Sequence, residues 1–205
     1  MTKTKAPRKP KTPTALSSRM GQYLTVERVI IGGSLLVTVA IIGIIALNAW
    51  LNRPIAIEGV QRVAVLQGHQ ETPVNYQQTP PAGGLHYPIW QNCAVYAQSI
   101  EDEFAVHSLE HGAVWITYDP TVPQDQVETL QSITRGGTHR LLSPYSGLSS
   151  PIVVSAWGYQ LQLESATDDR LVQFVRQYER GSQSPEPGAS CSGGESRSVA
   201  EMPSR

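Results

Sequence analysis

The longest feature of the hydropathy pattern is an apolar run from Val29 to Asn52 that contains no charged residue. As a helix rising about 1.5 Å per residue, this run spans about 35 Å, which is enough to cross a lipid bilayer. A cleaved signal peptide is the alternative. However, the run is longer than the apolar region of such a peptide, and no small-x-small cleavage motif follows it. The pattern therefore predicts a single uncleaved transmembrane helix over residues 29–52.

After Arg53 the chain breaks into short segments with strand or helix periodicity. Alternating or β-branched apolar residues indicate strands, and apolar residues three and four apart indicate helices. The predicted strands are Ile57–Leu66, Ala113–Tyr118, His139–Leu142, Pro151–Trp157 and Tyr159–Glu164. The predicted helices are Gln124–Thr134 and Asp168–Arg180, the second of which has Gly181 just beyond its end.

A long loop is predicted between the first two strands, over residues 68–92. Pro73, Pro80, Pro81 and Pro88 exclude a helix there and disfavour a central strand. Proline also stiffens such a loop, and long loops in compact domains are often functional.

The order of strands and helices predicts an α+β fold, with a small mixed or antiparallel sheet carrying two helices on one face. The predicted organisation is a basic cytoplasmic tail over 1–28, the transmembrane anchor over 29–52 and an extracytoplasmic α+β domain over 55–181. Ser, Pro, Gly and Glu dominate residues 182–205, and this composition predicts a mostly disordered tail.

Charge sets the expected orientation. The chain has 16 Lys and Arg against 17 Asp and Glu, so a nucleic-acid-binding role is not expected. Residues 1–19 are basic and lack acids, and basic flanks stay on the cytoplasmic side of a membrane. Cys93 and Cys191 then lie outside, where two thiols usually form a disulfide. Two free thiols, or Cys93 as a metal ligand, are the alternatives.

Histidines supply the candidate chemistry. His107 and His111 are four residues apart, so they share a face whether the segment is helical or extended. His69 and His86 lie in the stiff loop and complete a predicted four-histidine metal site. Imidazole suits zinc and Cu(II). Glu103, Glu110 and Tyr87 are predicted to orient the ligands, with Glu110 or Glu103 as an oxygen ligand being the alternative, whereas His139 stands apart and is predicted to be structural or exposed.

Two other interpretations of the histidines stay open. The first is a polar network without metal that fixes the loop on the sheet. The second is a zinc-dependent hydrolase, because His107-x-x-Glu110-His111 matches the inverted zincin pattern, in which the glutamate activates water. That mechanism requires a helix under the motif, but Gly112 and a strand-like run follow at once.

Several blocks in order along the chain resemble the bacterial domain-of-unknown-function 3105 family. The blocks are Gly68-His69, Pro80–His86, Cys93–Tyr96, His107–Val114, Ala156-Trp157-Gly158 and Ser184–Pro187. The departures are small: Gly83-Gly84-Leu85 stands where Ser-Gly-Pro is common, and Ala94 stands where Gly is common. The resemblance implies a basic N-terminus, one anchor and this domain. It brings no activity, substrate or cofactor, but it supports treating His69, His86, His107, Glu110 and His111 as one group.

The sequence thus predicts a single-pass protein of the bacterial cytoplasmic membrane, with the N-terminus inside and the domain outside. Binding at a histidine-rich zinc or copper site is favoured over catalysis. The rival hypotheses are a hydrolase that uses Glu110 as base and a metal-free interaction domain of an envelope assembly. The expected partners are the lipid bilayer and, under the last hypothesis, another envelope protein.

Overall fold

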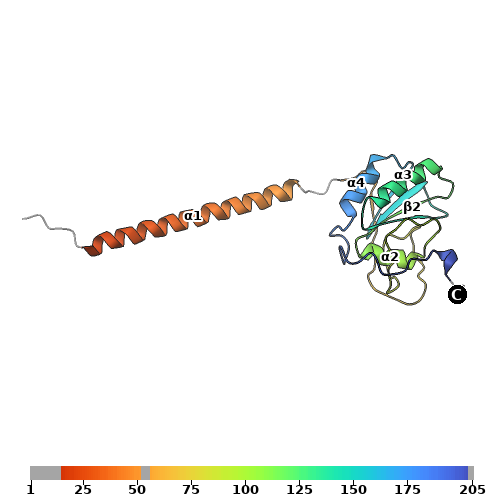
Figure 1. Cartoon of the computed structure of the whole chain (residues 1–205), viewed down its shortest axis with the longest axis horizontal. Helices are drawn as coiled ribbons and strands as arrows, with labels where there is room; N and C mark the ends of the chain where they lie inside the picture. The colour runs from red at the N-terminus through yellow and green to blue at the C-terminus, as the bar shows by residue number, and fades with distance from the viewer. Residues whose placement is uncertain (1–14, 52–55, 203–205) are drawn as a thin grey trace, which may run out of the picture. The chain divides into compact units, whose positions relative to one another are not determined.

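The computed structural model describes residues 15–51 and 56–202, and side chains over 28–50 and 56–202. Half of the predicted basic tail, residues 1–14, lies outside the described residues. The chain divides into two compact units, Met1–Pro54 and Ile55–Arg205. In the first unit, α1 (Ala15–Leu51) forms one continuous helix (Figure 1). Its segment Arg28–Trp50 is long and apolar enough to cross a membrane, which agrees with the predicted span.

The second unit is built on a five-stranded mixed sheet in the order β1-β5-β4-β2-β3. The strands are β1 (Gln61–Arg62), β2 (Val114–Tyr118), β3 (Arg140–Pro144), β4 (Ile152–Ala156) and β5 (Tyr159–Leu163). Only β2 and β3 are parallel, and α3 (Gln124–Arg135) connects them. The other pairs are antiparallel. The predicted α+β class with a mixed sheet is confirmed.

One face of the sheet carries α3 and α4 (Asp169–Tyr178), as predicted (Figure 1). Alternate residues of β2, such as Val114 and Ile116, point to this face because strand side chains alternate between faces. They pack against Leu130 of α3 and against Leu171 and Phe174 of α4, in the same buried core.

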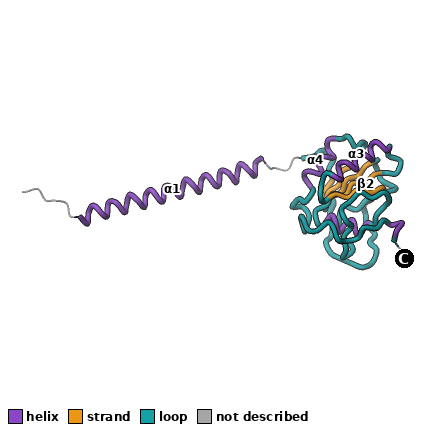
Figure 2. Tube along the Cα trace, viewed as in Figure 1, coloured by secondary structure: helices purple, strands orange, loops and turns teal. Residues whose placement is uncertain are grey.

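The opposite face of the sheet carries a third helix, α2 (Asp102–Glu110), which the sequence pattern did not identify as a helix (Figure 1). Trp115 and Leu141 point to this face and pack with Val106 and Leu109 of α2. Loops cover the rest of this side, so the sheet lies within a loop-rich domain (Figure 2). As a result, α2 is buried along nearly its whole length.

Two segments differ from expectation. The strand predicted over Ile57–Leu66 is limited to Gln61–Arg62 in the structure, because these are the residues of that segment that pair with β5 at the exposed sheet edge. The segment after Ser182, expected to be mostly disordered, lies along the domain as far as Met202. Main-chain hydrogen bonds hold it there, among them Cys93 N–H to the Cys191 carbonyl (2.8 Å) and Val199 N–H to the Ser99 carbonyl (2.8 Å).

The carboxyl group of Asp102 at the start of α2 makes stability depend on pH. Burial raises the pKa of Asp102 to about 6, while the Tyr145 hydroxyl donates a hydrogen bond of 2.9 Å to it. Asp102 ionises at a lower pH in the unfolded chain than in the folded chain. The free energy of unfolding therefore falls as pH rises from about 4 to 6. Because Asn does not ionise, we expect the free energy of unfolding of Asp102→Asn to rise by about 2–3 kcal/mol relative to that of wild type over that interval. Denaturant unfolding of both proteins at pH 4 and 7 measures the gain, and a difference that does not change with pH would contradict it.

Candidate metal centre

Two segments of the long loop place the first pair of histidines side by side. The Gln70 N–H donates to the His86 carbonyl (2.8 Å), and the His86 N–H donates to the Gly68 carbonyl (3.1 Å). This short parallel bridge aligns His69 with His86, and their ring centroids are 4.7 Å apart. His86 is fully buried, whereas the His69 side chain is 48% exposed and faces solvent.

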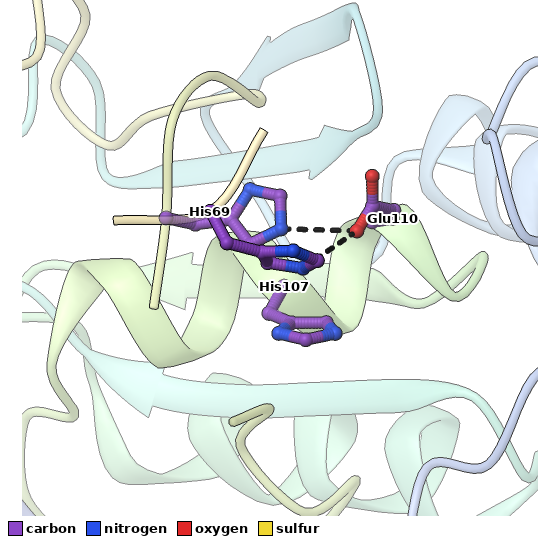
Figure 3. A group of neighbouring side chains, drawn as sticks. His69, His107 and Glu110 are labelled. Atoms are coloured by element: carbon purple, nitrogen blue, oxygen red, sulfur yellow. Dashed lines mark hydrogen bonds and ion pairs between the residues drawn. The ribbon is translucent and has the colours of Figure 1, made fainter. Parts of the chain in front are cut away.

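The last turn of α2 supplies the other groups. His107 and Glu110 lie one turn apart on α2, and His111 follows as its C-cap. All three are at least 95% buried. Figure 3 shows the side chains of His69, His107 and Glu110 gathered together, with interactions drawn to the Glu110 carboxylate.

The Glu110 carboxylate contacts two of the histidines. Its Oε2 atom is 3.0 Å from His86 Nε2 and 3.5 Å from His69 Nε2. One ligand atom from each of His69, His86, His107 and Glu110 lies within 4.8 Å of the others. His111 extends the group, because its Nε2 atom is 3.0 Å from His107 Nε2.

Main-chain carbonyls fix the tautomers of three of these imidazoles. Nδ1 lies 2.7 Å from the Gly84 carbonyl in His86, 2.7 Å from the Tyr87 carbonyl in His107 and 2.6 Å from the Ser190 carbonyl in His111. A carbonyl oxygen can only accept a hydrogen bond, so each Nδ1 carries the proton. In the neutral rings, Nε2 is therefore a bare lone pair, as a metal ligand requires.

These lone pairs face other acceptors. His86 Nε2 faces the Glu110 carboxylate, and His107 Nε2 faces His111 Nε2, each at 3.0 Å. Neither contact has a hydrogen-bond donor when the imidazoles are neutral and the carboxylate is ionised. A cation between the acceptors, either a proton or a metal ion, turns both contacts from repulsive to attractive.

The surroundings disfavour a proton on His86 Nε2 or His107 Nε2. Burial lowers the pKa of His86, and burial together with the neighbouring imidazoles lowers the pKa of His107 to about 4. At neutral pH these rings are uncharged. A metal ion is then the cation that suits the geometry, because neutral imidazoles and a carboxylate are ordinary metal ligands.

The residues predicted to orient the ligands act in three different ways. Glu110 itself faces His69 and His86 and offers a carboxylate oxygen to the group. Tyr87 contacts His107 through its carbonyl group, and its ring packs on Phe104. Glu103 Oε1 instead accepts a hydrogen bond of 2.7 Å from the Val74 N–H and so ties the loop to α2.

His139 and the cysteines lie outside the cluster. His139 is buried, and its Nε2 donates to the Ala189 carbonyl (2.9 Å), consistent with a structural role. Cys93 and Cys191 are paired at disulfide distance, with Cα atoms 5.3 Å apart, so Cys93 is not placed as a metal ligand.

Glu186 and Ser190 of the C-terminal segment contact the cluster at His111, and the sequence analysis did not predict either of them. Glu186 Oε2 lies 3.6 Å from His111 Nε2, and the Ser190 carbonyl accepts from the same ring. The Glu186 N–H also donates to the Glu110 carbonyl (3.0 Å), which the end of α2 leaves without a helical partner. The family resemblance could have pointed to Glu186 as a site residue, because Glu186 lies within the Ser184–Pro187 block that carries the resemblance.

Comparison with known proteins gives one match. The family described as "Protein of unknown function (DUF3105)" matches residues 69–193, which begin at His69 and include every residue of the cluster. Searches among curated proteins and among solved structures found no match.

Proposed function

The chain belongs to the DUF3105 family, and on that premise we propose that it is a membrane-anchored, extracytoplasmic binding protein whose histidine cluster holds zinc or copper. The observation that carries this proposal is the pair of donor-less contacts at 3.0 Å, His86 to Glu110 and His107 to His111. The histidines of the cluster, His111 included, offer imidazole nitrogens and Glu110 offers a carboxylate oxygen, donor types that suit zinc or Cu(II).

Binding is a better fit than hydrolysis with Glu110 as base. The Glu110 carboxylate is only 2% exposed and already faces two imidazole nitrogens. A general base must instead reach a water molecule that attacks the substrate. The half-exposed His69 gives the site a route to solvent, along which an ion can enter and leave.

We predict that the full chain, purified in detergent without a polyhistidine tag, contains at least one equivalent of zinc or copper. His86→Ala should lower metal affinity by at least about 100-fold, because it removes a buried ligand rather than a residue that merely orients one. Elemental analysis after gel filtration and isothermal titration of chelator-treated protein measure the two quantities.

His139→Ala is the matched control, since it also removes a buried imidazole bonded to a main-chain carbonyl. It should keep the metal. The proposal is wrong if wild-type protein contains no metal and takes none up from zinc or copper solutions.

The orientation of the anchor is part of the proposal. The apolar segment Arg28–Trp50 follows a basic N-terminal sequence, which favours retention of the N-terminus inside. We expect protease added to intact spheroplasts to degrade a tag at the C-terminus and to spare a tag at the N-terminus. Protection of the C-terminal tag would exclude this orientation.

A further inference from the structure

The metal-binding groups around α2 separate into two sets, and from this separation we infer that the cluster holds two divalent cations. The first ion lies between His69, His86 and Glu110. The second lies between His107, His111 and Glu186. This inference rests on the proposed metal binding and specifies its stoichiometry and ligands.

Distances within each set suit a single ion. Ligand atoms held at 2.0–2.1 Å by one tetrahedral ion are about 3.3 Å apart, and no two can exceed about 4.2 Å. Glu110 Oε2 lies 3.0 Å from His86 Nε2 and 3.5 Å from His69 Nε2 in the first set. In the second set, His111 Nε2 lies 3.0 Å from His107 Nε2 and 3.6 Å from Glu186 Oε2.

His107 lies near both sets: its ligand atom is within 4.8 Å of those of His69, His86 and Glu110, and its Nε2 atom is 3.0 Å from His111 Nε2. His107 also has only one lone pair to offer, because its Nδ1 donates to the Tyr87 carbonyl. Since that lone pair faces His111 Nε2 at 3.0 Å, the geometry assigns His107 to the second ion.

The C-terminal segment holds the second set in place. The Ser190 carbonyl fixes the tautomer of His111, and the Gly188 N–H donates to the His111 carbonyl (2.9 Å). The pairing of Cys93 with Cys191 anchors the residue next to Ser190. Glu186 is thereby kept beside His111, although its side chain is 55% exposed.

Charge and spacing are consistent with two ions. Each set combines two neutral imidazoles with one carboxylate, so each dication meets one negative charge. Paired metal sites in proteins usually hold their ions about 3.5–4 Å apart, and the rings of His86 and His107, one from each set, have centroids 4.8 Å apart. Three protein ligands leave each ion at least one position for water or an exchangeable ligand.

The experiment uses the full chain in detergent, stripped with chelator and reloaded with Zn²⁺ alone. Wild-type protein should bind two equivalents, and Glu186→Gln should bind one. Because Glu186 is half exposed, this substitution leaves the buried parts of the fold intact. Glu164→Gln, at an exposed position just after β5, is the matched control and should keep two. His111→Ala should also reduce the stoichiometry to one.

Reloading with Cu²⁺ gives a second measurement. Two nearby Cu(II) ions should broaden or abolish the electron paramagnetic resonance signal by spin coupling, and Glu186→Gln should restore the signal of an isolated ion. One equivalent in wild type that Glu186→Gln does not change would overturn the two-ion inference and leave metal binding standing. Absence of any bound ion would overturn both.

Discussion

Replacing Cys93 and Cys191 together by serine should lower the free energy of unfolding by about 4–5 kcal/mol. The two residues are 98 positions apart, and a cross-link that closes a loop of about 100 residues restricts the unfolded chain by about 4.7 kcal/mol. The folded chain keeps the other contacts of the C-terminal segment, such as Asn92 N–H to the Glu195 carbonyl (2.7 Å). The cost therefore arises mainly in the unfolded state.

Guanidinium unfolding of the full chain in detergent, followed by tryptophan fluorescence, measures this loss. Trp115 and Trp157 are buried in the domain and report on its unfolding. Wild-type protein treated with a reductant is the control and should match the double-serine variant. Equal unfolding midpoints for oxidised wild type and the variant would show that the pair contributes nothing to stability.

Gly112→Ala should lower the free energy of unfolding by about 2–5 kcal/mol and should also weaken metal binding. Gly112 follows His111 with φ of +91°, a conformation that residues with a side chain rarely adopt. A Cβ atom there would lie 2.9 Å from the Arg180 Cα, a backbone atom that cannot swing away. Relieving this contact must move the end of α2, which carries His107, Glu110 and His111.

Gly147→Ala is the matched control for this substitution. Gly147 has a similar φ of +81°, but nothing lies within 4 Å of its added Cβ. Gly147→Ala should therefore lower the free energy of unfolding by only about 1 kcal/mol, which is the cost of the backbone conformation alone. The variant should keep its metal. Equal losses at the two glycines would show that contact with Arg180 is unimportant.

The elements with a clear apolar pattern could be predicted from the sequence. Leu171, Val175 and Tyr178 form a stripe along α4 and are buried in the structure, and the run Val114–Tyr118 forms the fully buried interior strand β2, between β4 and β3. Helix α2 could not be found in this way. Both of its sides are covered, so buried Glu103 and Glu110 interrupt any apolar stripe.

The candidate site was predictable in part for similar reasons. The spacing of His107 and His111 indicates a shared face in any conformation, and the structure places their Nε2 atoms 3.0 Å apart. The contacts of Glu110 with His69 and His86 depend on how the loop bearing these histidines packs on α2, which spacing alone does not specify. Glu186 was missed because its segment has the composition of a disordered tail, although hydrogen bonds to α2 hold it in place.

The separation along the chain between His111 and the residues that hold it sets an order of events during biogenesis. Glu186 and Ser190 follow His111 by 75 and 79 residues, so in the proposed orientation they leave the ribosome and the translocation channel well after His111 does. The pairing of Cys93 with Cys191 also waits for an oxidant outside the cytoplasm. In that orientation we expect an ion bound by the proposed His107–His111 site to be acquired only after export, from the pool outside the membrane rather than from cytoplasmic metal during synthesis.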